Sequence, residues 1–142
     1  MNKISAKGVF FGGIIDIVST NIFSIPLFFY LYKTLNLAHT PRDQIQAAIA
    51  AAIQSNILIF SVQVAIGIGS SILGGYLAAR IAKHNEFING ALSAWLCVSF
   101  GIYAMISGES HASSLSQIAN LIAAPVSGLV GGYLGFKLKG TK

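Results

Sequence analysis

The sequence has few charged residues. Its 142 residues include nine Lys or Arg and four Asp or Glu, so 9% are charged while 54% are hydrophobic. A soluble domain carries roughly a quarter charged residues. So few charges cannot coat the surface of a soluble domain of this length, and the composition therefore predicts a surface that faces lipid.

Cysteine is almost absent, since Cys97 is the only one. A single cysteine excludes a disulfide framework and a Cys-rich metal motif. The three histidines, His39, His84 and His111, are far apart in the sequence, so we predict no metal site. Cys97 lies inside an apolar run, where we interpret it as a small packing residue.

Motifs for catalysis and for nucleic-acid binding are also missing. There is no G-x-S-x-G, no H-E-x-x-H, no phosphate loop and no pair of neighbouring carboxylates. The basic residues stand at the ends of apolar runs and do not form a patch with interleaved aromatics. We therefore expect no enzyme activity, no cofactor and no nucleic-acid partner.

Long apolar runs are what the sequence does contain. About 20 apolar residues cross the hydrocarbon core of a bilayer, and four segments qualify, which predicts helices over about 8–32, 54–82, 87–106 and 117–138. No alternating pattern of the kind found in a transmembrane barrel is present. The predicted fold is all-α, a single integral membrane four-helix bundle whose first partner is the lipid bilayer.

The distribution of Lys and Arg predicts the orientation of the bundle, because cytoplasmic loops are enriched in these residues. With four spans, both termini and the middle loop share one side. That side holds seven basic residues, Lys3, Lys7, Arg80, Lys83, Lys137, Lys139 and Lys142, and the other holds only Lys33 and Arg42. We expect a bacterial inner (plasma) membrane protein with both termini in the cytoplasm.

The connection 34–53 is predicted to be an outer loop with a possible helical extension. Residues 40–43 have the features of a helix start, because Thr40 is a cap, Pro41 fits the first turn and Asp43 favours the positive helix end. A helix from Pro41 to Lys83 would be ~60 Å long, twice the hydrocarbon thickness. Such a helix must tilt, bend or protrude from the bilayer.

Small residues recur at four-residue intervals on the second and fourth predicted helices. This pattern is typical of close contacts between membrane helices. The predicted packing residues are Gly12, Gly67, Ser71, Gly74, Gly75, Gly128, Gly131 and Gly132. The partner helix could belong to this chain, to a second copy or to another protein.

An internal echo links residues 74–80 to residues 131–137, because both segments contain Gly-Gly-Tyr-Leu followed by a basic residue at the same spacing. Two readings stay open. The echo indicates either two helical hairpins related by a parallel repeat, or convergence on tight packing with a basic anchor.

Residues 74–82 read Gly-Gly-Tyr-Leu-Ala-Ala-Arg-Ile-Ala, and Asn89-Gly90 follows. With this GGYxAxRxA hairpin motif the chain resembles a group of small four-helix bacterial membrane proteins. The resemblance covers the hairpin and implies the four-helix topology. It implies no particular substrate.

The first predicted helix carries an ionisable residue on a face of small and polar residues, with Gly12, Asp16 and Thr20 at four-residue intervals. An acid inside a membrane normally faces a bundle interior or an aqueous cavity, which makes Asp16 the first candidate site. Counted along the helices, Asp16 lies level with Ser71 or Gly74. One interpretation is a structural ion pair or hydrogen bond from Asp16 to Arg80, Tyr76 or Tyr133, and the other is a site that binds a proton or a cation.

Three functions are compatible with this arrangement. We favour a small integral membrane subunit that packs through glycine-rich helices, either with itself or within a larger membrane complex. The alternative is a minimal proton- or cation-linked transporter or channel whose pathway passes Asp16, Thr20, Asn21 and Gln63. A lipid-handling or membrane enzyme ranks last, since the sequence offers one buried carboxylate.

Overall fold

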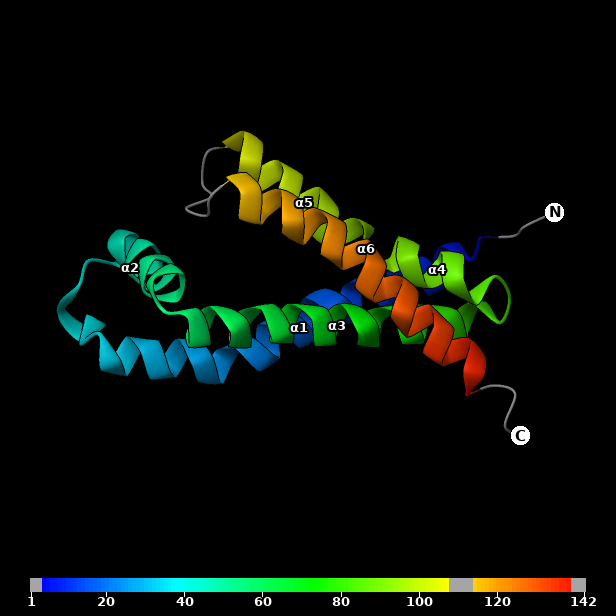
Figure 1. Cartoon of the computed structure of the whole chain (residues 1–142), viewed down its shortest axis with the longest axis horizontal. Coiled ribbons are helices and arrows are strands. Elements are labelled where there is room, and N and C mark those ends of the chain that lie inside the picture. The colour runs from blue at the N-terminus through cyan, green and yellow to red at the C-terminus, as the bar shows by residue number, and fades with distance from the viewer. Residues whose placement is uncertain (1–3, 108–113, 139–142) are drawn as a thin grey trace.

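Every regular element in the part of the chain that the structure describes is a helix, as the predicted fold class requires. The structure is a computed structural model that describes residues 4–107 and 114–138 (Figure 1). The elements are α1 (Ala6–Thr34), the short 3-10 helix η1 (Leu37–His39), α2 (Arg42–Ser55), α3 (Ile57–Ala82), α4 (Glu86–Ser93), α5 (Trp95–Ser107) and α6 (Ser114–Lys137).

Three helical segments of the described chain are long and apolar enough to cross a membrane. They are α1, α3 and the segment Glu86–Ser107, which comprises α4 and α5. The fourth predicted segment, 117–138, is helical within α6 but is not among these three.

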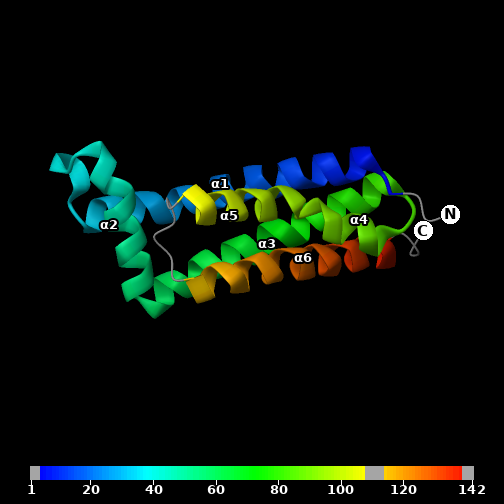
Figure 2. The ribbon, with the colours of Figure 1, turned by 90° about the horizontal axis from the view of Figure 1, so that it is seen from above.

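The helices meet closely at one end of the molecule and diverge toward the other. α3 packs along α1 on one side and along α6 on the other, and α4 packs on α6. Figure 2 shows the start of α1, the end of α3, α4 and the end of α6 together at one end, which we call the closed end. In Figure 1, α5 and the first half of α6 rise away from α1 and α3, and α2 lies at this other, open end.

The second predicted helix is not continuous from Pro41. The chain breaks at Asn56, which has an extended backbone (φ −122°, ψ 110°) between α2 and α3. The Asn56 side chain accepts hydrogen bonds from the backbone N–H groups of Leu58 and Ile59, at 3.0 and 3.3 Å. Asn56 is therefore the N-cap of α3, and its cap accounts for the bend that the excess length required.

The third predicted helix, 87–106, is also divided in the structure. At Ala94 the backbone N–H reaches back to Ala91 and Leu92 instead of continuing the α-helical ladder. The Ser93 hydroxyl donates to Gly90 O at 2.7 Å, and such a side-chain hydrogen bond competes with those of the helix backbone. The break lets α4 stay against α6 while α5 leaves the closed end.

Glycines bring the backbones at the closed end into contact. A Cβ on Gly74 of α3 would lie 2.6 Å from the backbone oxygen of Gly12 on α1. A Cβ on Gly75 of the same helix would overlap the backbone oxygen of Gly128 on α6, and a Cβ on Gly132 of α6 would lie 2.6 Å from the backbone oxygen of Glu86 on α4. The predicted small-residue contacts at these glycines are thus made within one chain. Gly67 is different, because it has no such neighbour within 4 Å.

The two Gly-Gly pairs of the internal echo are used differently. Gly74 faces α1, whereas its counterpart Gly131 faces the α3 backbone at Ile72 and Tyr76. The second members of the pairs, Gly75 and Gly132, face α6 and α4. Each pair thus contacts two helices, and both the repeat and the convergence interpretation stay open.

One buried amide joins the helix ends at the closed end. Asn89 of α4 is fully buried, and its Oδ1 accepts from the backbone N–H of Ser5 at 2.8 Å. Its Nδ2 donates to the backbone oxygens of His84 and Asn85 at 2.9 and 3.0 Å. Asn89 thus connects the start of α1 to the short turn between α3 and α4.

Candidate functional site

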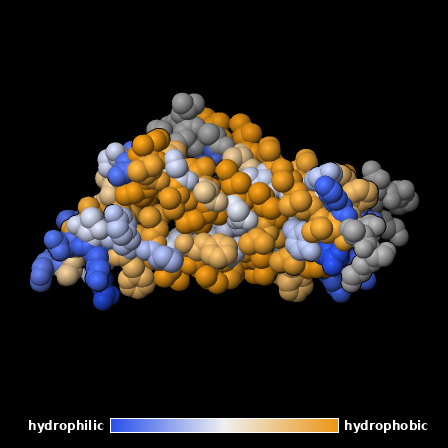
Figure 3. All heavy atoms as spheres, turned by 60° about the horizontal axis from the view of Figure 1, so that its bottom comes forward, coloured by the Kyte–Doolittle hydropathy of each residue, from blue (hydrophilic) through white to orange (hydrophobic). Residues whose placement is uncertain are grey.

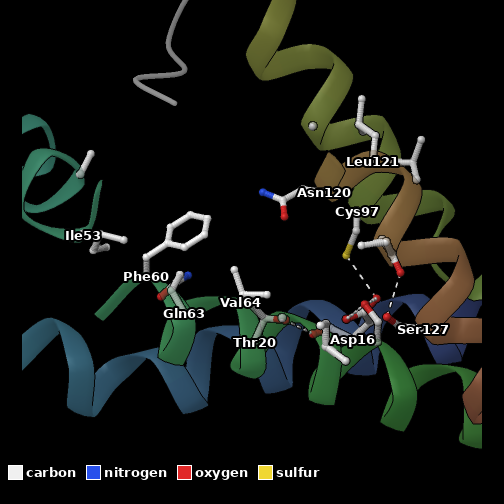
Figure 4. A pocket seen from close by; sticks show the side chains of 18 of the residues that line it. Asp16, Thr20, Ile53, Phe60, Gln63, Val64, Cys97, Asn120, Leu121 and Ser127 are labelled. Atoms are coloured by element: carbon white, nitrogen blue, oxygen red, sulfur yellow. Dashed lines mark hydrogen bonds between the residues drawn. The ribbon is translucent and has the colours of Figure 1, made fainter. Parts of the chain in front are cut away.

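A cavity of about 510 Å³ lies between the diverging helices, on the side of the open end (Figure 4). Residues from α1, α2, α3, α5 and α6 line it. They are Asp16, Thr20, Ala50, Ile53, Gln54, Phe60, Gln63, Val64, Gly67, Ile68, Ser71, Cys97, Val98, Gly101, Asn120, Leu121, Ala123, Ala124 and Ser127.

Asp16 forms the inner end of this cavity. Its residue surface is 1% exposed. The Ser71 hydroxyl on α3 lies 3.0 Å from Oδ2 and 3.2 Å from Oδ1 of the carboxylate, and the Cys97 thiol on α5 donates to Oδ2 at 3.3 Å. Figure 4 shows Asp16 and Cys97 facing each other, with Phe60 and Ile53 at the far end. One acid is thus held by donors from two other helices.

Close helix packing is what buries Asp16. A Cβ on Gly74 would lie 2.9 Å from the Asp16 Cβ, so α3 approaches α1 closely here because position 74 has no side chain. A Cβ on Gly13 would similarly lie 2.9 Å from Ser93 O, at the break between α4 and α5. The glycines of the closed end therefore shut the cavity just beyond the carboxylate.

Of the polar residues predicted on the pathway, Thr20 and Gln63 line the cavity with Asp16. The Thr20 hydroxyl donates to the backbone oxygen of Asp16 at 2.8 Å, within α1. Asn21 is exposed and donates to Ile17 O at 2.8 Å, also within α1. Asn21 is not a lining residue, so the structure does not bring it together with the other predicted pathway residues. It follows Thr20, and adjacent positions on a helix point in different directions.

Arg80, the predicted ion-pair partner of Asp16, lies elsewhere. It is exposed, and its guanidinium carbon is 5.9 Å from the ring centre of Tyr76. Arg80 follows Ser71 by nine positions, which is ~13.5 Å along α3. The distance is too great for the side chain to replace Ser71, so neutral donors and not a cation contact the carboxylate.

Cys97, Asn120 and Ser127 also line the cavity, although the sequence did not single them out as site residues. The apolar run around Cys97 predicts a packing residue, because nothing in that run marks the thiol as part of a polar site. Its role depends on which helix lies opposite Asp16, and the break at Ala94 decides that. Asn120 could have been found from the sequence, because a polar amide inside the apolar run of the fourth predicted helix indicates a polar site.

The charge of the lining is simple. Asp16 is the single acid, and no Lys, Arg or His is among the lining residues in the described parts of the chain. Within those parts no group of three His, Cys, Asp or Glu side chains is placed to hold a metal ion. Chemically, the site can accept a proton or one positive charge at the end of a mainly apolar cavity.

Comparisons with known proteins add no information about this site. No protein-family model matches the chain, and neither a curated protein nor a solved structure matches it. The chemistry of the Asp16 cavity is therefore what bears on function.

Proposed function

We propose that this chain is an integral membrane protein with four spans in the plasma membrane of a bacterium. In support, three segments have the length and composition for crossing. α6 has 24 residues, or ~36 Å at ~1.5 Å per residue, against a hydrocarbon core of ~30 Å. On the face in Figure 3, apolar surface covers the middle of the molecule and hydrophilic residues gather at its ends. Phe29, Phe100 and Ile106 are 63%, 62% and 81% exposed, which suits a lipid-facing surface.

The proposed orientation puts the closed end in the cytoplasm. Lys7, Arg80, Lys83 and Lys137 are all exposed near this end. Cytoplasmic segments are enriched in basic residues. The cavity and α2 would then be on the outer side.

Within this membrane protein, we propose that Asp16 is the binding site of a small proton- or cation-linked transporter. The observation that carries the proposal is a buried carboxylate at the inner end of a cavity that has no cationic lining residue in the described chain. Ionisable groups inside a membrane are costly and mark ion pathways and proton relays. A structural ion pair would give Asp16 a cationic partner, whereas the two side chains that contact its carboxylate, Ser71 and Cys97, are neutral.

Glycine packing no longer favours the subunit function over transport. The small residues at four-residue intervals, which suggested a partner helix, make their contacts within this chain. Gly74 contacts α1, and Gly75 contacts α6. They need no second protein.

The test measures proton flux across the membrane of liposomes that contain the purified protein. The flux with the wild type is compared with the flux with the Asp16→Asn variant. We expect the variant to elute from a sizing column as the wild type does and to lose the flux. A variant that retains the flux, or one that fails only in assembly, would show that Asp16 is structural.

A subunit function keeps one observation in its favour. Ser61, Ala65 and Gly69 form an exposed row at four-residue intervals on α3, and Gly69 has no neighbour within 4 Å. Because a Cβ at Gly69 would meet nothing within 4 Å, such a row leaves room for a close helix contact with a second copy or a larger membrane complex. Purification from the native host in mild detergent tests it, since a stoichiometric membrane partner would favour this function.

A further inference from the structure

We propose that the ligand of the Asp16 cavity is a monovalent organic cation with an apolar body, whose charged group binds the Asp16 carboxylate. The inference rests on the proposed transport function and specifies its substrate class. It follows from the charge, the hydrogen bonding, the size and the lining of the cavity.

The charge of the site favours a single positive charge. Asp16 is buried and is the one acid of the lining, and the described lining offers no Lys, Arg or His to pair with it. An unpaired buried charge is strongly unfavourable, whereas a partner of opposite sign offsets much of its desolvation cost. A ligand with one positive charge neutralises the site. An anion would meet only repulsion.

The carboxylate has acceptor capacity left for a ligand. Ser71 has one hydroxyl hydrogen shared between the two oxygens, and Cys97 supplies one weak donor to Oδ2. An ionised carboxylate offers about four lone-pair sites. The two protein donors therefore orient Asp16 without saturating it, and about two sites remain for a cationic group that enters from the cavity.

The volume and walls of the cavity favour an organic ion over an inorganic one. A cavity of about 510 Å³ lies within the ~300–1,000 Å³ range of small-molecule sites. Its walls include Phe60, Val64, Ile68, Val98 and Leu121. A bare metal cation needs several oxygen ligands close together. Asp16 is the one carboxylate of the lining, and no group of three His, Cys, Asp or Glu side chains lies together in the described chain. An apolar ligand body fills the same space favourably.

The layout of the cavity assigns a direction to the ligand. In Figure 4, Asp16 and Cys97 lie at one end, and Phe60 and Ile53 lie at the other, next to α2. The charged group is therefore placed at the inner end, with the apolar body directed toward the open end of the molecule.

Two ions of the same size and opposite charge test this substrate class. Radiolabelled tetraphenylphosphonium and tetraphenylborate are measured for saturable binding to the purified protein in detergent. We expect the phosphonium to bind with at most one ion per chain and the borate not to bind saturably. Asp16→Asn should weaken phosphonium binding at least tenfold. The matched control, Asp43→Asn, changes an exposed acid that does not line the cavity and should leave binding unchanged.

A second pair of variants keeps the test decisive if Asp16→Asn does not fold. Gly67 lines the cavity and Gly69 lies on the exposed face of the same helix, and an added Cβ would meet nothing within 4 Å at either position. Gly67→Leu places a side chain in the cavity one turn from Ser71 and should abolish phosphonium binding. Gly69→Leu adds the same side chain outside the cavity and should preserve it.

The outcomes separate this inference from the transport function. Equal binding of both ions, or phosphonium binding that survives Asp16→Asn or Gly67→Leu, overturns the substrate class. Proton flux that depends on Asp16 without phosphonium binding overturns the substrate class and leaves the transport function standing. Selective phosphonium binding without coupled flux supports the substrate class and overturns transport.

Discussion

Asn89 connects three parts of the chain at the closed end through its single buried amide. Its oxygen holds Ser5 at the start of α1, and its nitrogen holds the turn at His84 and Asn85. The turn needs such support, because Asn85 and Lys83 have positive φ angles of 46° and 59°. Asn89 is thus a residue on which the assembly of the closed end depends.

We predict that Asn89→Ala lowers the free energy of unfolding by about 2–3 kcal/mol, because it removes a buried amide and leaves backbone groups without their partner. The measurement is the midpoint of thermal unfolding in detergent. Asn21→Ala is the matched control, since the Asn21 amide is exposed and bonds only within its own helix. Equal midpoints for the two variants would show that the Asn89 network is not stabilising.

The sequence predicts Asp16 and its level in the bundle, but it does not predict all the residues that contact its carboxylate. Its charge inside an apolar run marked it, and counting residues along the helices put it level with Ser71 or Gly74, which is where the structure has it. The Cys97 contact could not be found in this way. A thiol is ordinary in an apolar helix, and only the packing of α5 decides which residue it faces.

At the scale of the helix, the glycines of α3 have opposite requirements. Gly74 and Gly75 meet the backbones of α1 and α6, so these positions tolerate no side chain. Gly67 and Gly69 have open space around them. The small-residue pattern is the same along the whole helix, and only the structure distinguishes the glycines that make contacts.

We predict that Gly75→Ala destabilises the protein by several kcal/mol, because its Cβ would overlap the backbone oxygen of Gly128 and force α3 and α6 apart. Gly69→Ala should be neutral or stabilising by up to ~1 kcal/mol, since alanine favours the helix. Thermal unfolding of the two variants in detergent measures the difference. A smaller loss for Gly75→Ala than for Gly69→Ala would contradict the observed contact of α3 with α6.

Helix positions were predictable where apolar runs are long, and helix breaks were not. Between Arg42 and Gly67 there is no Gly or Pro, yet Asn56 ends one helix and caps the next. An asparagine is a known cap, but it also occurs within membrane helices, so its position alone was ambiguous. Ala94 carries no breaking signal, because alanine favours helix, and the break there depends on contacts of its neighbours with other helices.

At the scale of the whole molecule, the closed end and the cavity have separate causes in the sequence. Glycines concentrated near the end of α3 and the end of α6 allow contact there. Larger side chains, such as Phe60 and Leu121, occupy the facing positions toward the other end, where the helices stand apart around the cavity. The same pairing of helices thus produces a tight end and an open end.

The proposed orientation makes a prediction for the two ends. In a Cys97→Ser background, a single cysteine is introduced as Asp43→Cys in α2 or as His84→Cys in the turn after α3, both at exposed positions. A membrane-impermeant maleimide should label the α2 cysteine in intact spheroplasts and the turn cysteine only after permeabilisation, because basic residues such as Lys83 favour the cytoplasmic side. Labelling in the reverse order would place the mouth of the cavity in the cytoplasm. The Asp16 site would then take its ligand from inside the cell, and the proposed orientation would be wrong.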